Sequence, residues 1–148
     1  MVNRSLRALL IFSAFTLSAC VGPVRSFETF EGKAAGTADT ILSSVQTAKL
    51  AADLTASGKA SGPYVSVVVA DAEQGAESAR AAFDSIQPPD QTSDELRGRA
   101  DALFARAIST ISMMRIAARR EDVATIQRLG RALQQFTAPL ERLAGSGG

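Results

Sequence analysis

Histidine and tryptophan are absent from the 148 residues of this chain, and cysteine and tyrosine occur only once each. Without histidine the chain lacks the side chain that most often acts as a general base and as a ligand for transition metals. A lone cysteine cannot form an internal disulfide, so packing alone must stabilise the fold. We therefore expect a protein that is not an enzyme and that holds no metal and no cofactor.

Charge is nearly balanced, with 16 basic and 15 acidic residues. The absence of a basic excess or a polybasic run argues against nucleic acid as a partner. The distribution is nevertheless uneven, because residues 26–90 contain four basic and nine acidic side chains, whereas residues 91–148 contain nine basic and six acidic ones. We expect these halves, with net charges of −5 and +3, to attract each other.

The first nineteen residues have the three-part layout of an export signal. Arg4 and Arg7 precede an apolar stretch at residues 8–17, and the small residues Ser18 and Ala19 follow it. This stretch has about half of the roughly 20 residues that a helix needs to cross a bilayer. We therefore expect residues 1–19 to be a signal peptide and not a permanent transmembrane anchor.

Leu17, Ser18, Ala19 and Cys20 resemble the lipobox of bacterial lipoprotein precursors, which has an aliphatic residue three positions before a cysteine and small residues between them. The resemblance implies that the thiol of Cys20 receives a diacylglycerol and that the chain is cut before it. It also implies anchoring by acyl chains to the outer face of the bacterial cell membrane, with outer-membrane sorting in a diderm host. The alternative is an ordinary secretory signal with a chance cysteine.

A short tether follows the cysteine. Residues 20–26 comprise Cys20 and six further residues, which span roughly 20 Å at most. Beyond the tether, the alanine- and arginine-rich composition and the DSIQPPD break at residues 84–90 are similar to those of small uncharacterised lipoproteins of actinobacteria. That resemblance implies no active residues.

Four later segments repeat apolar residues at steps of three and four, the period of an amphipathic helix. The stripes cover residues 27–52, 65–86, 96–118 and 126–143. Residues 64–70, YVSVVVA, are rich in β-branched side chains typical of a strand, but a strand here would have no partner, so we predict a helix. Gly32 and Gly36 in the first segment predict close packing against another helix.

Two boundaries of these segments have specific signals. Thr92 and Glu95 have the spacing of a capping box, which predicts Thr92 as the N-cap of the third helix. Residues 119–122, RRED, indicate a tight reversal between the third and fourth helices, with one long helix as the alternative. Together the segments predict an all-α fold, an antiparallel up-down four-helix bundle over residues 27–144, with a flexible tail at 145–148. The alternative is a pair of helical hairpins that completes its core by dimerising.

The polar surfaces offer weaker candidates. Glu73 and Glu77 lie one turn apart and opposite the apolar stripe, as expected of a solvated surface and not of a calcium or magnesium site. Arginines of the second half could contact anionic lipid headgroups, although we expect most of them to be solvated or paired with the acidic half. These arginines are Arg97, Arg99, Arg106, Arg115, Arg119, Arg120, Arg128 and Arg131.

The segment 104–118, FARAISTISMMRIAA, has an apolar arc wider than one bundle seam requires. Central burial, a subunit interface, or a cleft for an apolar ligand would each account for such an arc. The candidate residues are Phe104, Ile108, Ile111, Met113, Met114 and Ile116. The leading functional prediction is a non-catalytic, lipid-anchored bundle that interacts with an envelope protein or a second copy or that supports the envelope. The second is a protein that binds an apolar ligand or lipid.

Overall fold

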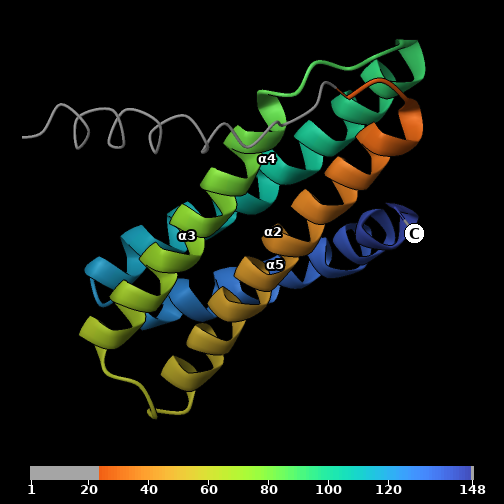
Figure 1. Ribbon diagram of the computed structural model, residues 1–148. Coiled ribbons are helices and arrows are strands. Elements are labelled where there is room, and N and C mark those ends of the chain that lie inside the picture. The colour runs from red at the N-terminus through yellow and green to blue at the C-terminus, as the bar shows by residue number, and fades with distance from the viewer. Residues whose placement is uncertain (1–23, 148) are drawn as a thin grey trace, which may run out of the picture.

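The computed structural model describes residues 24–147, which form four long helices and a terminal 3-10 turn without any strand. These elements are α2 (Phe27–Ala56), α3 (Gly62–Asp84), α4 (Gln91–Arg119), α5 (Val123–Ala144) and η2 (Gly145–Gly147). Successive helices run in opposite directions (Figure 1). The all-α class is confirmed, and the arrangement is consistent with a four-helix bundle. The expected signal peptide and Cys20 lie outside the described residues.

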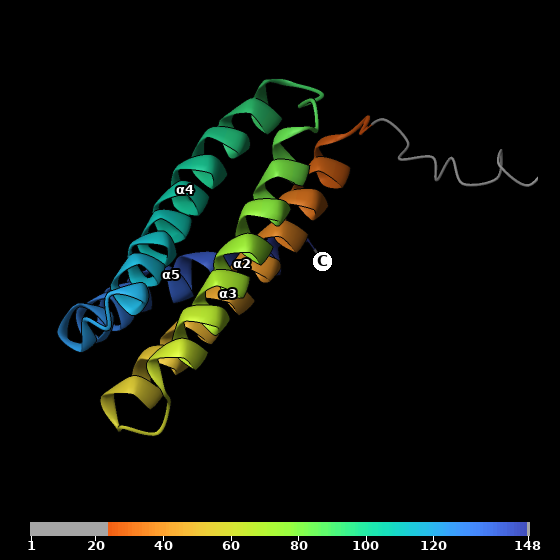
Figure 2. The ribbon, with the colours of Figure 1, turned by 90° about the vertical axis from the view of Figure 1, so that its left-hand side faces the viewer.

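The helices α2 and α4 each contact all three other helices, whereas α3 and α5 do not contact each other. The axes of α2, α3 and α4 are nearly parallel or antiparallel, while α5 lies obliquely behind these three helices (Figures 1 and 2). Because of this inclination, α5 contacts α2 more extensively than it contacts α4.

The core follows the four apolar stripes. Three phenylalanines from three helices meet at one end, where the ring centroids of Phe30 and Phe83 are 5.3 Å apart and those of Phe83 and Phe104 are 5.9 Å apart. Elsewhere the core combines larger apolar residues with alanines, several of which on α2 and α3 are fully buried. In the ambiguous segment 64–70, Val65 and Val69 are buried while Val67 is 59% exposed, which is the pattern of a helix and not of a strand.

Local side chains set where the helices begin. The hydroxyl of Ser26 accepts a hydrogen bond from the Thr29 amide at 3.3 Å, as an N-cap residue should. The expected N-cap of α4, Thr92, is wrong, because the carboxylate of Asp90 takes this role and accepts from the Ser93 amide at 2.8 Å. A carboxylate at a helix start gains from the dipole as well as from the hydrogen bond, and the Pro88-Pro89 pair keeps the chain extended just before it.

Two reversals use the same backbone motif. After α2, the amide of Lys59 donates to the Leu54 carbonyl at 2.9 Å and Gly58 has a φ of 66°. After α4, the amide of Asp122 donates to the Ala117 carbonyl at 3.0 Å and Glu121 has a φ of 54°. These are Schellman motifs, in which the left-handed position is usually a glycine.

The second reversal is unusually short because one residue serves both helices. Asp122 completes the Schellman motif of α4 with its amide, and its carboxylate accepts the Thr125 amide at 2.9 Å as the N-cap of α5. Hydrogen bonding to Thr125 holds the pKa of the Asp122 carboxyl below its usual value. The predicted reversal at residues 119–122 is therefore confirmed.

The helices α2 and α5 approach most closely at a glycine. A Cβ placed on Gly130 would lie 2.6 Å from the Cβ of Ala52, which is far inside van der Waals contact. The close packing against another long helix expected at Gly32 and Gly36 is wrong, since a Cβ on either would meet nothing within 4 Å, and only the turn η2 lies close to the Cα of Gly32. Their GxxxG spacing lies at a part of α2 where no other helix approaches the added atom.

The expected flexible tail begins with an ordered turn. Gly145–Gly147 form η2, which packs on the early part of α2, and a Cβ on Gly147 would lie 2.7 Å from the Cβ of Ala35. The absence of a side chain permits this approach. The tail therefore holds the end of α5 against α2.

Substitutions at the two residues with a left-handed backbone, Gly58 and Glu121, should change the free energy of unfolding in opposite directions. We expect Glu121→Gly to raise the free energy of unfolding by about 0.5–1 kcal/mol, because it removes a strained φ. Gly58→Ala should lower it by about 1 kcal/mol for the same reason. Urea unfolding followed by circular dichroism measures both, and changes of the same sign would contradict the assignment.

Glycine-to-alanine changes should likewise separate packing from helix propensity. Gly130→Ala should lower the free energy of unfolding by about 1–3 kcal/mol, because the added methyl overpacks the α2–α5 contact. Gly98→Ala is the matched control on exposed α4, where a Cβ meets nothing within 4 Å, and should raise it by up to about 1 kcal/mol. If thermal and urea unfolding rank the two variants in the reverse order, the close contact is not as described.

Candidate functional site

The six candidate residues of the wide apolar arc divide into two groups. Four are in the core: Phe104, Ile108, Ile111 and Met114. The other two, Met113 and Ile116, are 48% and 42% exposed. The arc is wide because α4 packs against all three other helices. None of the six residues lines the groove described in the next paragraph.

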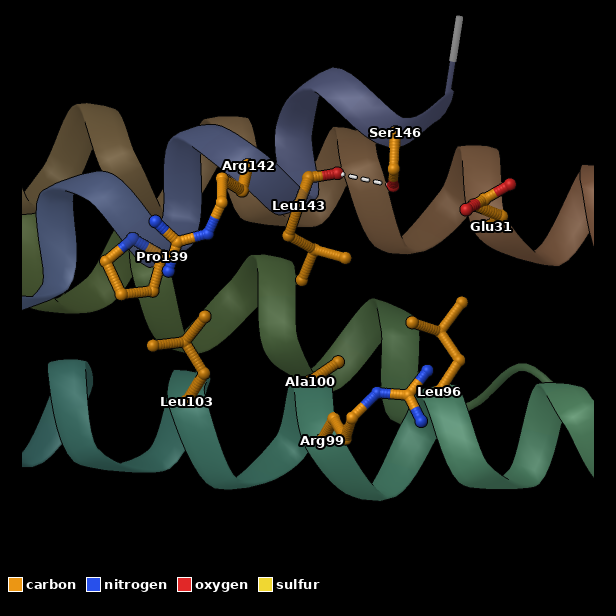
Figure 3. Close-up of a pocket in the computed structure, with 9 residues that line it drawn as sticks. All are labelled: Glu31, Leu96, Arg99, Ala100, Leu103, Pro139, Arg142, Leu143 and Ser146. Carbon is orange, nitrogen blue, oxygen red and sulfur yellow. Dashed lines mark hydrogen bonds between the residues drawn. The ribbon is translucent and has the colours of Figure 1, made fainter.

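An open groove of about 410 Å³ lies between the first half of α4 and the end of α5. Its apolar lining consists of Leu96, Ala100, Leu103, Pro139 and Leu143, and its polar lining consists of Glu31, Arg99, Arg142 and Ser146. Figure 3 shows the side chains of Leu103 and Leu143 pointing into the space between the two helices, Leu103 from α4 and Leu143 from α5. The guanidinium groups of Arg99 and Arg142 belong to opposite walls (Figure 3).

Helical periodicity explains the wall that α4 provides. Leu96, Ala100 and Leu103 follow one another at steps of four and three, so they share one face. Leu103 and Leu143 both belong to predicted core stripes, yet both are only half-buried because they border the groove. The oblique course of α5 separates its last turns from α4 and leaves these leucines without a facing helix.

The turn η2, which follows α5, borders one end of the groove. The hydroxyl of Ser146 donates to the Leu143 carbonyl at 2.9 Å (Figure 3), which fixes η2 beside the groove. Glu31, on the second turn of α2, lines the same end. The groove therefore lies at the end of the molecule where α2 begins.

Arg97 anchors the start of α4. Its guanidinium donates to the main-chain carbonyls of Phe83, Asp84 and Ile86, at the end of α3 and in the loop after it. The same group lies 5.4 Å from the ring centroid of Phe30 and 5.0 Å from that of Phe83. A cation on the carbonyl end of a helix and over two aromatic faces is favourable on both counts. Arg97 thus joins α2, α3 and α4 next to the groove wall.

A mixed charge cluster adjoins this anchor. Burial and then repulsion from Asp84 raise the pKa of the Asp101 carboxyl, while Arg97 and Arg80 act in the opposite direction. Arg80 pairs with Asp84 at 3.6 Å on α3. The cluster therefore contains two acids and two bases, and its one ion pair lies within α3.

Glu73 does not lie on a solvated face as predicted. It is only 7% exposed and forms a two-pronged ion pair with the guanidinium of Arg115 on α4. This hydrogen bonding raises the pKa of Arg115 above its usual value. Within residues 24–147 it is the one ion pair between the acidic and the basic half. Sequence reasoning missed it because Glu73 stands at the edge of the apolar stripe, one turn after Val69.

Potential metal-ligating side chains do not cluster in the part of the chain that the structure describes. That part contains no group of three or more potential metal-ligating side chains. The ammonium of Lys49 donates to the side-chain carbonyl of Gln134 and so links α2 to α5.

Comparisons with protein-family models, curated proteins and solved structures found no match for this chain.

Neighbouring arginines of α4 should differ sharply in their effect on stability. Arg97→Ala should lower the free energy of unfolding by about 2–4 kcal/mol, because it removes charge-assisted hydrogen bonds and two cation–π contacts. Arg99→Ala, the matched control on the exposed side of the same turn, should change it by no more than about 0.5 kcal/mol. Chemical unfolding in urea measures both. Equal losses would show that Arg97 is not the anchor described.

Proposed function

We propose that the protein is a lipid-anchored, extracytoplasmic helical-bundle lipoprotein with a non-catalytic role in protein interaction or envelope support. The observation that carries the proposal is the lipobox pattern of Leu17–Cys20 behind a charged and an apolar region. The only cysteine of the chain stands at the one position where that pattern needs it. Two acyl chains on one residue give stable membrane anchoring, whereas a single chain gives only marginal binding.

The position of α2 supports a short distance between the domain and a membrane. The helix begins at Phe27, so six residues separate it from Cys20. A linker of that length spans roughly 20 Å at most. The end of the molecule where α2 begins is the end that carries the groove, so the groove would lie near the bilayer surface.

None of the helices within residues 24–147 has the length and the apolar character that a membrane span requires.

A second candidate role is the binding of an apolar ligand or lipid. The groove between α4 and α5 is the observation that favours it, since its volume and mainly apolar lining are in the range of small-ligand sites. This role is compatible with the lipid anchor and does not depend on it.

Replacement of the cysteine tests the anchor directly. In bacteria fed with labelled palmitate, the original chain should be labelled and should fractionate with membranes. Cys20→Ala should abolish labelling and remove the covalent lipid, because no other thiol is present. Ser18→Ala, which keeps a small residue in the pattern, is the matched control and should be labelled normally. Labelling that persists in Cys20→Ala would overturn the proposal.

A further inference from the structure

We propose that the groove between α4 and α5 binds a fatty acid, with its acyl chain along the leucines and its carboxylate at Arg99 and Arg142. The inference rests on the second role proposed above and is independent of the lipid anchor. It names the ligand class from the shape and the charge of the groove.

The lining selects for an apolar chain. Leu96, which is only 6% exposed, adds to the apolar lining. Leu103 and Leu143 present half-exposed side chains to the open space from opposite walls (Figure 3). Their half-exposed surface is removed from water when an aliphatic chain lies between them, which is the usual source of affinity for apolar ligands. The volume of about 410 Å³ suits a single slender chain and leaves little room for a second.

The charges select for an anionic head. Arg99 and Arg142 form no ion pair with any residue in the range 24–147, although each borders the apolar lining. Glu31 is the one acidic residue in the lining and Ser146 adds a hydroxyl, so the groove has a net positive charge. Guanidinium groups form charge-assisted hydrogen bonds with carboxylates, so each wall of the groove offers an exposed arginine as a partner for the anionic head.

Other occupants account for less of this arrangement. A second copy of the chain or a hydrophobic helix would cover the leucines, but it gives no reason for cations on both walls. A neutral apolar molecule has the same defect. The fatty acid matches both features, and the groove opens at the end of the molecule where α2 begins, beside which a lipid source would lie if Cys20 is acylated.

The test uses the full chain with Cys20→Ala, so that no covalent acyl chain competes and the result is the same whether or not Cys20 is a lipidation site. The probe is 11-(dansylamino)undecanoate, whose fluorescence rises in an apolar site, and its methyl ester is the neutral match. We expect saturable binding of the acid, displacement by palmitate, and at least tenfold weaker binding of the ester.

Substitutions in the groove locate the site. Arg99→Gln and Arg142→Gln should each weaken binding of the acid by about tenfold, because each removes one charge-assisted contact. Leu103→Gln should weaken the acid and the ester alike. Arg131→Gln, an exposed arginine of α5 outside this groove, is the matched control and should leave binding unchanged. Circular dichroism melts confirm that the variants keep their fold.

Several results would overturn the inference. One is the absence of saturable binding, and another is equal affinity for the acid and the ester. A third is binding that none of the groove substitutions alters. That third result would place the probe elsewhere, such as at the apolar residues 8–17. Sedimentation showing a dimer that Leu103→Gln dissociates would make the groove an interface between copies instead. Any of these leaves the palmitate labelling of Cys20 unaffected, so the two proposals fail separately.

Discussion

The guanidinium of Arg97 lies where three helices meet, and the arrangement at that end of the molecule depends on it. It covers the rings of Phe30 and Phe83 and binds the main-chain carbonyls at the end of α3. Helix ends leave carbonyls without partners, and a cation placed there satisfies them. Because α4 begins six residues earlier at Gln91, the same contacts fix the register of its first turns. The groove wall follows from that register.

The course of α5 accounts for the groove itself. Because Gly130 has no side chain, α5 lies directly against α2 at that point. The turn η2 after α5 also packs on α2, near Ala35. With both points on α2, the helix α5 lies obliquely to α4, and its last turns leave Leu103 only half-buried. An opening with an apolar lining thus results from small residues elsewhere on the helix.

Much of the fold could be predicted from periodicity and local signals. The four stripes predicted four helices, and RRED predicted the reversal between α4 and α5. The errors have physical causes: Asp90 competed successfully with Thr92 because a carboxylate adds a charge–dipole interaction to the cap hydrogen bond. The burial of Glu73 could not be predicted because it depends on Arg115, 42 residues later, which compensates the buried charge.

For the candidate site too, some features follow from the sequence alone and others depend on contacts between distant residues. The sequence by itself determined the amphipathic helices, since these depend on residue type and spacing alone. It also indicated a wide apolar arc on α4, without deciding which part is core. Only the tertiary structure decided that Phe104, Ile108, Ile111 and Met114 are buried and that Leu103 and Leu143 border an opening. The angle of α5 sets that opening, and an interhelical angle arises from contacts between residues far apart in the chain, such as Gly130 and Ala52, which no local pattern encodes.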